Sequence, residues 1–294
     1  MSDMDAETTI VGADVDEMPD DAVEKELGIG FWVCIGWLAT IGLVALLAPW
    51  LPVTSDGAQG GPREAPSMSH WFGTDANGRS VFDLTILGAR TSLAVGLFAI
   101  IFGMVVGGSL GIVAGYFKGK VDAVIGFIFF SLLSFPQLVL ALLIVNAFDQ
   151  VSLFTVAITL GILAVAPVGR LARAATLVFA EREFVLAAKV IGAKHFRIII
   201  RELLPNVLIP MAALGLLGMG VAIVAEGGLA FLGLSVDGGE SWGITINDGR
   251  QSRDLQENPW VAMFPIGVMF LTILSLNFAG DRVREYFDVR ETAF

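Results

Sequence analysis

The chain contains 294 residues, of which 55% are hydrophobic and only 16% are charged, and its mean hydropathy is +0.76. Soluble domains usually carry about 25% charged residues, so this composition excludes an ordinary globular protein and favours one built in a membrane. The net charge of −11 is concentrated at the start, and no extended basic stripe is present that could bind nucleic acid.

Residues 1–30 are predicted to form an acidic cytoplasmic tail. They hold ten carboxylates against one lysine, a net charge of −9. Such a segment has too little apolar surface to offset the entropy lost on ordering, so we expect it to be solvated or to form only a short element. It also lacks the basic start and the short apolar core of a cleavable signal peptide.

Six apolar stretches are long enough to cross about 30 Å of hydrocarbon. They lie at 31–51, 92–115, 123–148, 152–169, 206–234 and 260–280. None alternates with period two, and backbone groups cannot stay unpaired in lipid, so helices are favoured over a barrel. The sequence therefore predicts an all-α membrane protein with six transmembrane helices.

The connections between these stretches predict both the organisation and the orientation of the chain. With both termini in the cytoplasm, 13 of the 18 Lys and Arg residues lie inside, which is the usual bias. The predicted parts are the first helix at 31–51, an external loop at 52–91, a five-helix core at 92–281 with a cytoplasmic loop at 170–205, and a cytoplasmic tail at 282–294. The single cysteine, Cys34, rules out an intrachain disulfide framework.

The second stretch carries four glycines at intervals of four residues, Gly103, Gly107, Gly111 and Gly115. On a helix this spacing keeps them near one face, where the absence of side chains lets another helix approach closely. The approaching helix could belong to this chain or to a second subunit, and the pattern favours neither.

The third stretch is interrupted by Ser134-Phe135-Pro136-Gln137. A proline inside a helix removes a backbone hydrogen bond and can expose carbonyls. These four residues could line a substrate pathway, or they could form a tolerated kink whose freed groups bond to neighbouring helices.

The cytoplasmic loop contains an amphipathic segment, EREFVLAAKVIGAKHFRIIIRELLPN, from Glu181 to Asn206. Its apolar positions recur at helical spacing, Gly192 allows a turn, and a second helical piece is expected to end at Pro205. The segment could seat in a partner's groove through small and aromatic side chains, or lie on the inner leaflet as a basic helix. The candidate contact residues are Phe184, Ala187, Ala188, Gly192, Ala193, Lys194, His195, Phe196 and Pro205.

The fifth stretch holds Glu226, the one ionisable group at membrane depth. Such a residue is a candidate for function by default. It could line the pathway, or it could be a partly hydrated side chain that caps a helix break at Gly227–Gly228. Because no second ionisable group lies at comparable depth, a proton-coupled carrier is disfavoured.

The chain shows no motif for catalysis, cofactor binding or metal binding. His70 and His195 lie on opposite sides of the predicted membrane, and Gly119-Lys120 lacks the glycine spacing of a phosphate-binding loop. We therefore expect a chain that is not an enzyme and binds no cofactor or metal. The alternative of a membrane enzyme has no candidate catalytic site in the sequence.

Several motifs indicate a family. Ala187-Ala188, Gly192 and Leu204-Pro205 match a cytoplasmic motif written EAA, three residues, Gly, nine residues, I-x-L-P, although Leu186 replaces its Glu and Glu202 its Ile. Further matches are HWFGTD at 70–75, GR at 78–79, GARTSL at 88–93, Glu226 with LAFLGL at 229–234, WG at 242–243, and the closing pattern at 277–290 with Val289 in place of Pro. Over roughly residues 70–294, the sequence resembles the permease subunits of ATP-binding-cassette importers, most closely the C-type subunit of the dipeptide, oligopeptide and nickel group.

The resemblance implies a type I importer permease in a prokaryotic cell membrane. It implies a second permease, two cytoplasmic ATPases that use ATP and Mg, and an external substrate-binding protein. The short helix of the cytoplasmic loop would be the coupling helix, which transmits closure of the ATPase dimer to the membrane helices. The expected substrates are dipeptides or oligopeptides; nickel or another small solute is the alternative, and a stand-alone carrier is a second one.

Overall fold

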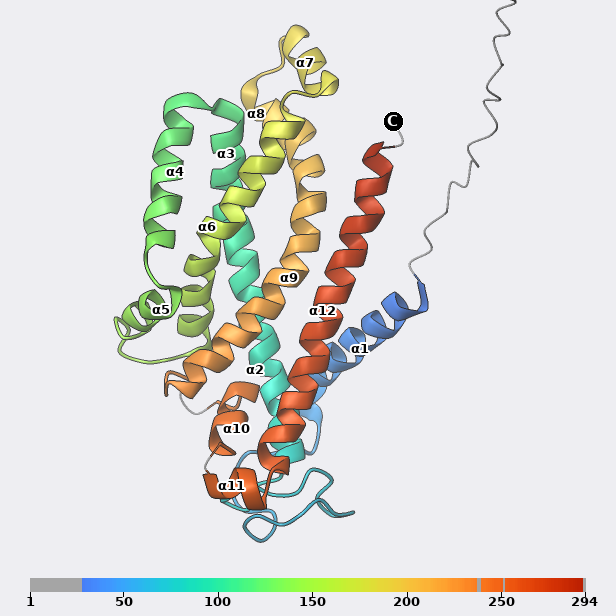
Figure 1. Cartoon of the computed structure of the whole chain (residues 1–294), viewed down its shortest axis with the longest axis vertical. Coiled ribbons are helices and arrows are strands. Elements are labelled where there is room, and N and C mark those ends of the chain that lie inside the picture. Colours follow the sequence, from blue (N-terminus) through green and yellow to red (C-terminus); the bar gives the residue numbers. More distant parts are fainter. Residues whose placement is uncertain (1–27, 237–238, 251, 293–294) are drawn as a thin grey trace, which may run out of the picture.

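The computed structural model describes residues 28–236, 239–250 and 252–292. The acidic tail predicted at 1–30 therefore lies almost entirely outside the described residues. Within the described ranges the chain is nearly all helical, and the one β-type pairing is an isolated bridge between Thr74 and Ser80. Figure 1 shows long helices side by side, with α7 at one end and α10 and α11 at the other.

The longer elements supply the body of the molecule. They are α1 (Gly28–Leu47), α2 (Val81–Phe102), α3 (Ser109–Phe117), α4 (Gly119–Ser134), α6 (Leu153–Phe179), α9 (Leu204–Phe231) and α12 (Trp260–Thr292). Shorter pieces connect or extend them. They are the 3₁₀ turn η1 (Ala48–Trp50), the π-helical segments η2 (Gly103–Gly108) and η3 (Ile198–Leu203), and the short helices α5 (Gln137–Val145), α7 (Glu183–Val190), α8 (His195–Arg197), α10 (Trp242–Asp248) and α11 (Ser252–Glu257).

The prediction of an all-α membrane protein with six spans is confirmed, with one span broken. Five continuous stretches are long and apolar enough to cross a membrane: Gly28–Trp50, Val81–Phe117, Leu153–Phe179, His195–Phe231 and Trp260–Tyr286. The sixth is the pair α4 and α5, which are bent by 90° at Phe135–Pro136. Pro136 lies between these two helices and not within either one, so the SFPQ sequence ends a helix.

The helices extend beyond the predicted apolar stretches. The loop expected at 52–91 ends at Ser80, where the Ser80 hydroxyl accepts a hydrogen bond from the Asp83 amide (3.3 Å) and caps α2. The predicted stretch at 92–115 was defined by the absence of charge, so it could not extend back past Arg90 and Asp83 to the true start of the helix. A helix needs only its backbone bonds, and an acidic residue in its first turn is favourable.

The loop predicted at 170–205 is shorter in the structure, because α6 and α8 extend into it. Helix α6 continues to Phe179 and α8 begins at His195, which leaves only 180–194 between them. These residues, α7 included, are called the α7 segment below. At the C-terminus, the tail expected at 282–294 continues α12 as far as Thr292 within the described residues.

Pro205 does not end a helix, and that expectation was wrong. The chain is helical from His195 through Pro205 to Phe231, with Pro205 in the first turn of α9. The π-helical turn η3 lies immediately before it. Proline lacks an N–H but is tolerated in the first turn, and a local π turn is one of the adjustments that accommodate it.

The four glycines spaced by four face α6 of the same chain. A Cβ at Gly103 would meet Ala164 and one at Gly115 would meet Thr176, while the carbonyls of Val165 and Gly169 lie where Cβ atoms at Gly107 and Gly111 would stand. In a regular helix each step of four residues turns about 40° past a full revolution. The wider turn of η2 offsets part of this drift and keeps the row, called the glycine seam below, on α6.

The glycine seam predicts which glycines resist substitution. Gly111→Ala should lower the free energy of unfolding by about 1–3 kcal/mol, because its Cβ would meet the Gly169 carbonyl, a backbone atom that cannot easily move. Gly126→Ala on α4 is the matched control, since nothing lies within 4 Å of the added Cβ. Thermal unfolding in detergent compares the two. Equal midpoints would contradict the packing described here.

Candidate functional site

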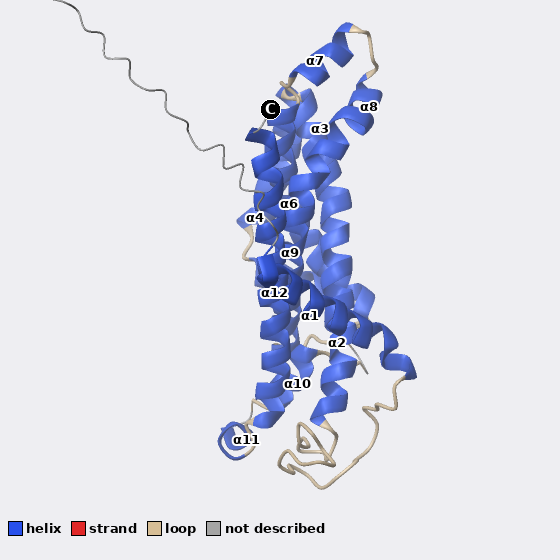
Figure 2. Cartoon of the chain, turned by 90° about the vertical axis from the view of Figure 1, so that its right-hand side faces the viewer, coloured by secondary structure: helices blue, strands red, loops and turns tan. Residues whose placement is uncertain are grey.

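The α7 segment projects from the end of the molecule at which α6 ends and α9 begins (Figures 1 and 2). Val185 is the one buried residue of α7, and it belongs to a cluster with Phe179 of α6 and Leu203 of η3. Ala188 and Ala193 pack against the same cluster. Ala188 and Ala193 therefore seat the segment on its own chain.

Gly192 ends α7 in a left-handed turn. Its φ is +82°, a region that side-chain-bearing residues rarely adopt. The Ala193 amide donates to the Ala188 carbonyl and the Gly192 amide to the Lys189 carbonyl, both at 3.0 Å, which is the Schellman pattern. The requirement for glycine is thus conformational, because no atom lies within 4 Å of an added Cβ.

The outward side of the α7 segment is apolar. Val190 is 87% exposed and Ile191 85% exposed, and Leu186 and Phe196 are also exposed. These four residues are called the α7 patch below. They lie on the α7 segment and, for Phe196, on α8 just after it, and they have no cover among the described residues, which is typical of a surface that binds another protein or a membrane. Of the four, only Phe196 is among the contact residues predicted from the sequence.

The other predicted contact residues lie around this patch. Phe184 is exposed but less so than Val190, Ala187 and Lys194 are exposed, and His195 bonds to Tyr116 through Nδ1 (2.8 Å). The structure thus brings together the residues predicted between Phe184 and Phe196 at one end of the molecule. Pro205 is set apart from them by η3.

A cavity of about 310 Å³ opens between α6 and α9, next to the break between α4 and α5. Its lining includes Met104, Leu160, Pro167 and Met211, and Gln137 is the single polar side chain among the described lining residues. Of the four residues predicted for a pathway at the break, Gln137 alone reaches the cavity. The Ser134 hydroxyl instead donates to the Phe130 carbonyl (2.8 Å) within its own helix.

Glu226 does not line this cavity. It is 2% exposed and accepts hydrogen bonds from the hydroxyls of Ser92 on α2 (3.0 Å) and Ser241 at the start of α10. The proposed helix break at Gly227–Gly228 was wrong, because α9 continues to Phe231. Glu226 therefore joins three helices in the interior.

Helix α10 fits tightly against α2 and α9. Trp242 is fully buried; its indole Nε1 donates to the Thr85 carbonyl (2.9 Å) and its amide to the Ser92 hydroxyl (3.2 Å). At Gly243 an added Cβ would meet Gly227 of α9. The short helix thus packs into the bundle at the end opposite α7, between the predicted stretches at 206–234 and 260–280.

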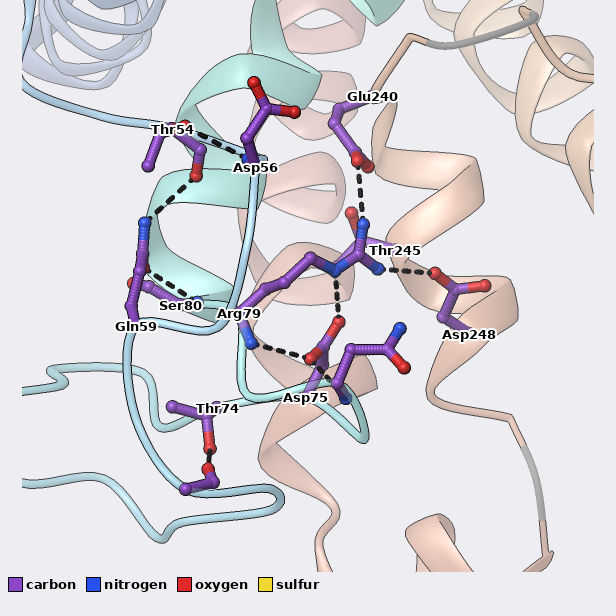
Figure 3. Close-up of polar contacts among 12 residues, drawn as sticks. Thr54, Asp56, Gln59, Thr74, Asp75, Arg79, Ser80, Glu240, Thr245 and Asp248 are labelled. Carbon is purple, nitrogen blue, oxygen red and sulfur yellow. Dashed lines mark hydrogen bonds and ion pairs between the residues drawn. The ribbon is translucent and has the colours of Figure 1, made fainter.

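Arg79 is the centre of a polar cluster at that same end, which Figure 3 shows. Its guanidinium donates to Asp75 (2.7 Å), Glu240 (2.9 Å) and Asp248 (3.2 Å). The Asp75 side chain is almost fully buried, and Asp248 is partly exposed. Arg79 thereby ties the loop before α2 to the residues around α10, and this cluster is called the Arg79 hub below.

Burial and unequal charge shift the pKa values within the Arg79 hub. Burial lowers the pKa of Arg79, but its hydrogen bond to Asp75 and the attraction of the carboxylates raise it above its usual value overall. Burial raises the pKa of Glu240 and of Asp248, and the attraction of Arg79 does not reverse this. One cation therefore stabilises three carboxylates that also repel one another.

Comparison with known proteins identifies the family. Residues 107–292 match the model of the binding-protein-dependent transport system inner membrane component. This chain belongs to that family. The match confirms the family indicated by the motif at 187–205, which is a family of membrane components of transport systems.

Curated relatives agree with this assignment. The dipeptide transport system permease protein of Alkalihalophilus pseudofirmus is 39% identical over 84% of this chain and 81% of its own length. A glutathione transport system permease protein of Pectobacterium atrosepticum is 34% identical over 76% of this chain and 74% of its own. The oligopeptide transport system permease protein of Haemophilus influenzae is 34% identical over 86% and 82%.

The fold is shared with a solved transporter. A chain of the inward-facing MetNI methionine ABC transporter superposes with a TM-score of 0.57 at 19% identity, covering 69% of this chain and 96% of that one. The membrane-spanning permease fold predicted from the sequence is thereby confirmed.

The Arg79 hub predicts a pH-dependent loss of stability. Arg79→Gln removes the cation from three carboxylates and should lower the free energy of unfolding by on the order of 3 kcal/mol at pH 8. The pKa values of Glu240 and Asp248 are raised in the folded state, so their ionisation disfavours folding. Their contribution to stability is fully present when the pH is below their pKa values in the unfolded state, about 4. It is lost as the pH rises through their higher pKa values in the folded state.

The loss of unfolding free energy caused by Arg79→Gln should therefore become smaller as the pH is lowered from 8 to 5, because these carboxyls take up protons. Thermal midpoints across this pH range measure it. Arg282→Gln, which breaks an exposed ion pair with Glu285, is the control and should change little at any pH. A deficit independent of pH would contradict the charge balance described for the hub.

Proposed function

We propose that this chain is the permease subunit of an ATP-driven importer of dipeptides or oligopeptides. It forms half of the translocation pathway, pairs with a second and different permease, and works with two cytoplasmic ATPases and an external substrate-binding protein. It does not catalyse ATP hydrolysis itself; ATP and Mg are used by the ATPases.

The observation that carries the coupling role is the α7 patch. Helix α7 buries Val185 on its own chain, whereas the four large apolar side chains of the α7 patch are exposed and suited to seating in another protein's groove. The alternative, a helix lying on the inner leaflet, is less well supported, because the α7 segment projects along the long axis beyond the ends of α6 and α9 (Figure 2).

The proposed orientation places the α7 segment in the cytoplasm. Figure 1 has the end of α12 near the same end of the molecule as α7, as the predicted topology requires. Seven Lys and Arg residues lie between Arg170 and Arg201, and this concentration favours the cytoplasmic side. The Arg79 hub and α10 then face the external binding protein.

The peptide substrate is supported by the relatives, whose names give dipeptide, oligopeptide and glutathione transport. A stand-alone proton-coupled carrier is disfavoured by the structure. Glu226, the candidate proton carrier predicted from the sequence, lies outside the cavity and accepts hydrogen bonds that join three helices.

A carboxylate in the α7 patch should prevent ATPase binding. Val190→Glu or Ile191→Glu would place a charge in an apolar interface, and we expect the ATPase subunits that co-purify with the chain to fall at least tenfold. Lys120→Gln on α4 changes the net charge equally at an exposed position outside the patch, and it should leave recovery unchanged. Recovery of the ATPases with both glutamate variants at the control level would refute this docking surface.

The substrate class is tested in vesicles that contain the whole importer and its binding protein. We expect ATP-dependent uptake of labelled dipeptides, which longer peptides compete with and nickel chelates do not. Nickel uptake that peptides leave unaffected would favour the small-solute alternative. Uptake by the purified chain alone, without nucleotide, would establish the stand-alone carrier instead.

A further inference from the structure

The turn between α3 and α4 contacts both ends of the α7 segment. At the first end, Lys118 Nζ lies 2.8 Å from Glu181 Oε1. Just past the second end, at the first residue of α8, a hydrogen bond of 2.8 Å joins the Tyr116 hydroxyl and His195 Nδ1. Three consecutive residues, 116–118, therefore hold the chain just before and just after α7.

A third contact lies between these two. The Lys189 ammonium of α7 lies 5.5 Å from the centre of the Tyr116 ring, within the range of a cation–π interaction. The rings of Tyr116 and Phe117 also meet the His195 ring edge-on or tilted, at 5.6 and 5.7 Å. The turn is thus joined to α7 itself as well as to its two ends.

The turn is short and its shape is fixed. Lys118 has φ of +53° and Gly119 has φ of +54°, so two left-handed residues reverse the chain directly from α3 into α4. On α4, Asp122 receives two hydrogen bonds from Arg173 of α6, one of them 2.6 Å long. Farther along, the buried Phe129 ring lies against Gly169. The hairpin of α3 and α4 is therefore one rigid unit with α6.

This unit leads from the α7 segment to the cavity. Helix α4 runs from the turn to Ser134, where the chain bends by 90°, and Gln137 just beyond the bend lines the cavity. Helix α7 itself buries only one residue, Val185, against the rest of the chain. The turn therefore supplies the polar connections between the α7 segment and the hairpin.

We propose that the α3–α4 turn is a brace through which movement of the α7 segment reaches the α4–α5 break, with Tyr116 and Lys118 as positioning residues for coupling. This inference rests on the proposed function. Coupled transport requires that the α7 segment and the cavity wall move together. The brace adds non-covalent contacts to the covalent continuation of the α7 segment into α6 and α8.

An exposed ion pair is well suited to testing this proposal. The Lys118 and Glu181 side chains are about half and three-quarters exposed, so their pairing contributes little to folding. Lys118→Glu turns an attraction into a repulsion, and the exchange Lys118→Glu with Glu181→Lys restores an attraction. Arg282→Glu is the matched control, since it places a repulsion against Glu285 in an exposed pair on α12.

The experiment uses the complete importer in vesicles and measures peptides transported per ATP hydrolysed. We expect Lys118→Glu combined with Tyr116→Phe to lower this ratio at least threefold while the ATPases still co-purify. The charge exchange should return the ratio to within twofold of the unmodified importer, and Arg282→Glu should not change it.

Two results would overturn the brace. In the first, the combined variant transports as many peptides per ATP as Arg282→Glu does. In the second, the combined variant loses the ATPases, which would make the turn part of the docking surface and not of the transmission. If the unmodified chain recruits no ATPase, the proposed function itself fails, and this outcome is distinct from both.

Discussion

The close approach of α2, η2 and α3 to α6 is the contact on which the arrangement of the molecule depends. Between membrane helices there is little hydrophobic driving force, so association relies on dense packing and polar contacts. The glycine seam supplies the packing, because carbonyls of α6 lie where side chains of the second span would otherwise stand. The seam reaches Gly115, at the last turn of α3.

That position has a consequence for the α7 segment. Since α3 is held against α6 up to its end, the turn at Lys118 is fixed beside the point at which α6 gives way to the α7 segment. Asp122 and Arg173 then meet across α4 and α6. The contacts of Tyr116 with His195 and of Lys118 with Glu181 are exposed, and it is the glycine packing that places their partners within reach of one another.

Local patterns could be predicted from the sequence, and pairings between distant residues could not. Hydropathy located every span, and the spacing of alanine, glycine and proline located the α7 segment, because both are properties of neighbouring residues. The Arg79 hub joins residues up to 169 positions apart, and nothing near Arg79 indicates Glu240 or Asp248. The partners of Glu226 were hidden for the same reason. Pro205 was misjudged because a π turn, which has no simple sequence signature, accommodates it.

The distribution of polar groups matches a subunit that moves a solute without retaining it. The charged hub and the hydrogen bonds of Glu226 lie outside the cavity, and the described cavity lining offers one amide among apolar side chains. A wall of this kind provides few groups that could bind a peptide tightly or select its side chains. Tight binding in the pathway would lower the energy of the bound state and slow release. A wall with few binding groups fits the proposed division of labour, in which this chain supplies a path and its connection to the α7 segment.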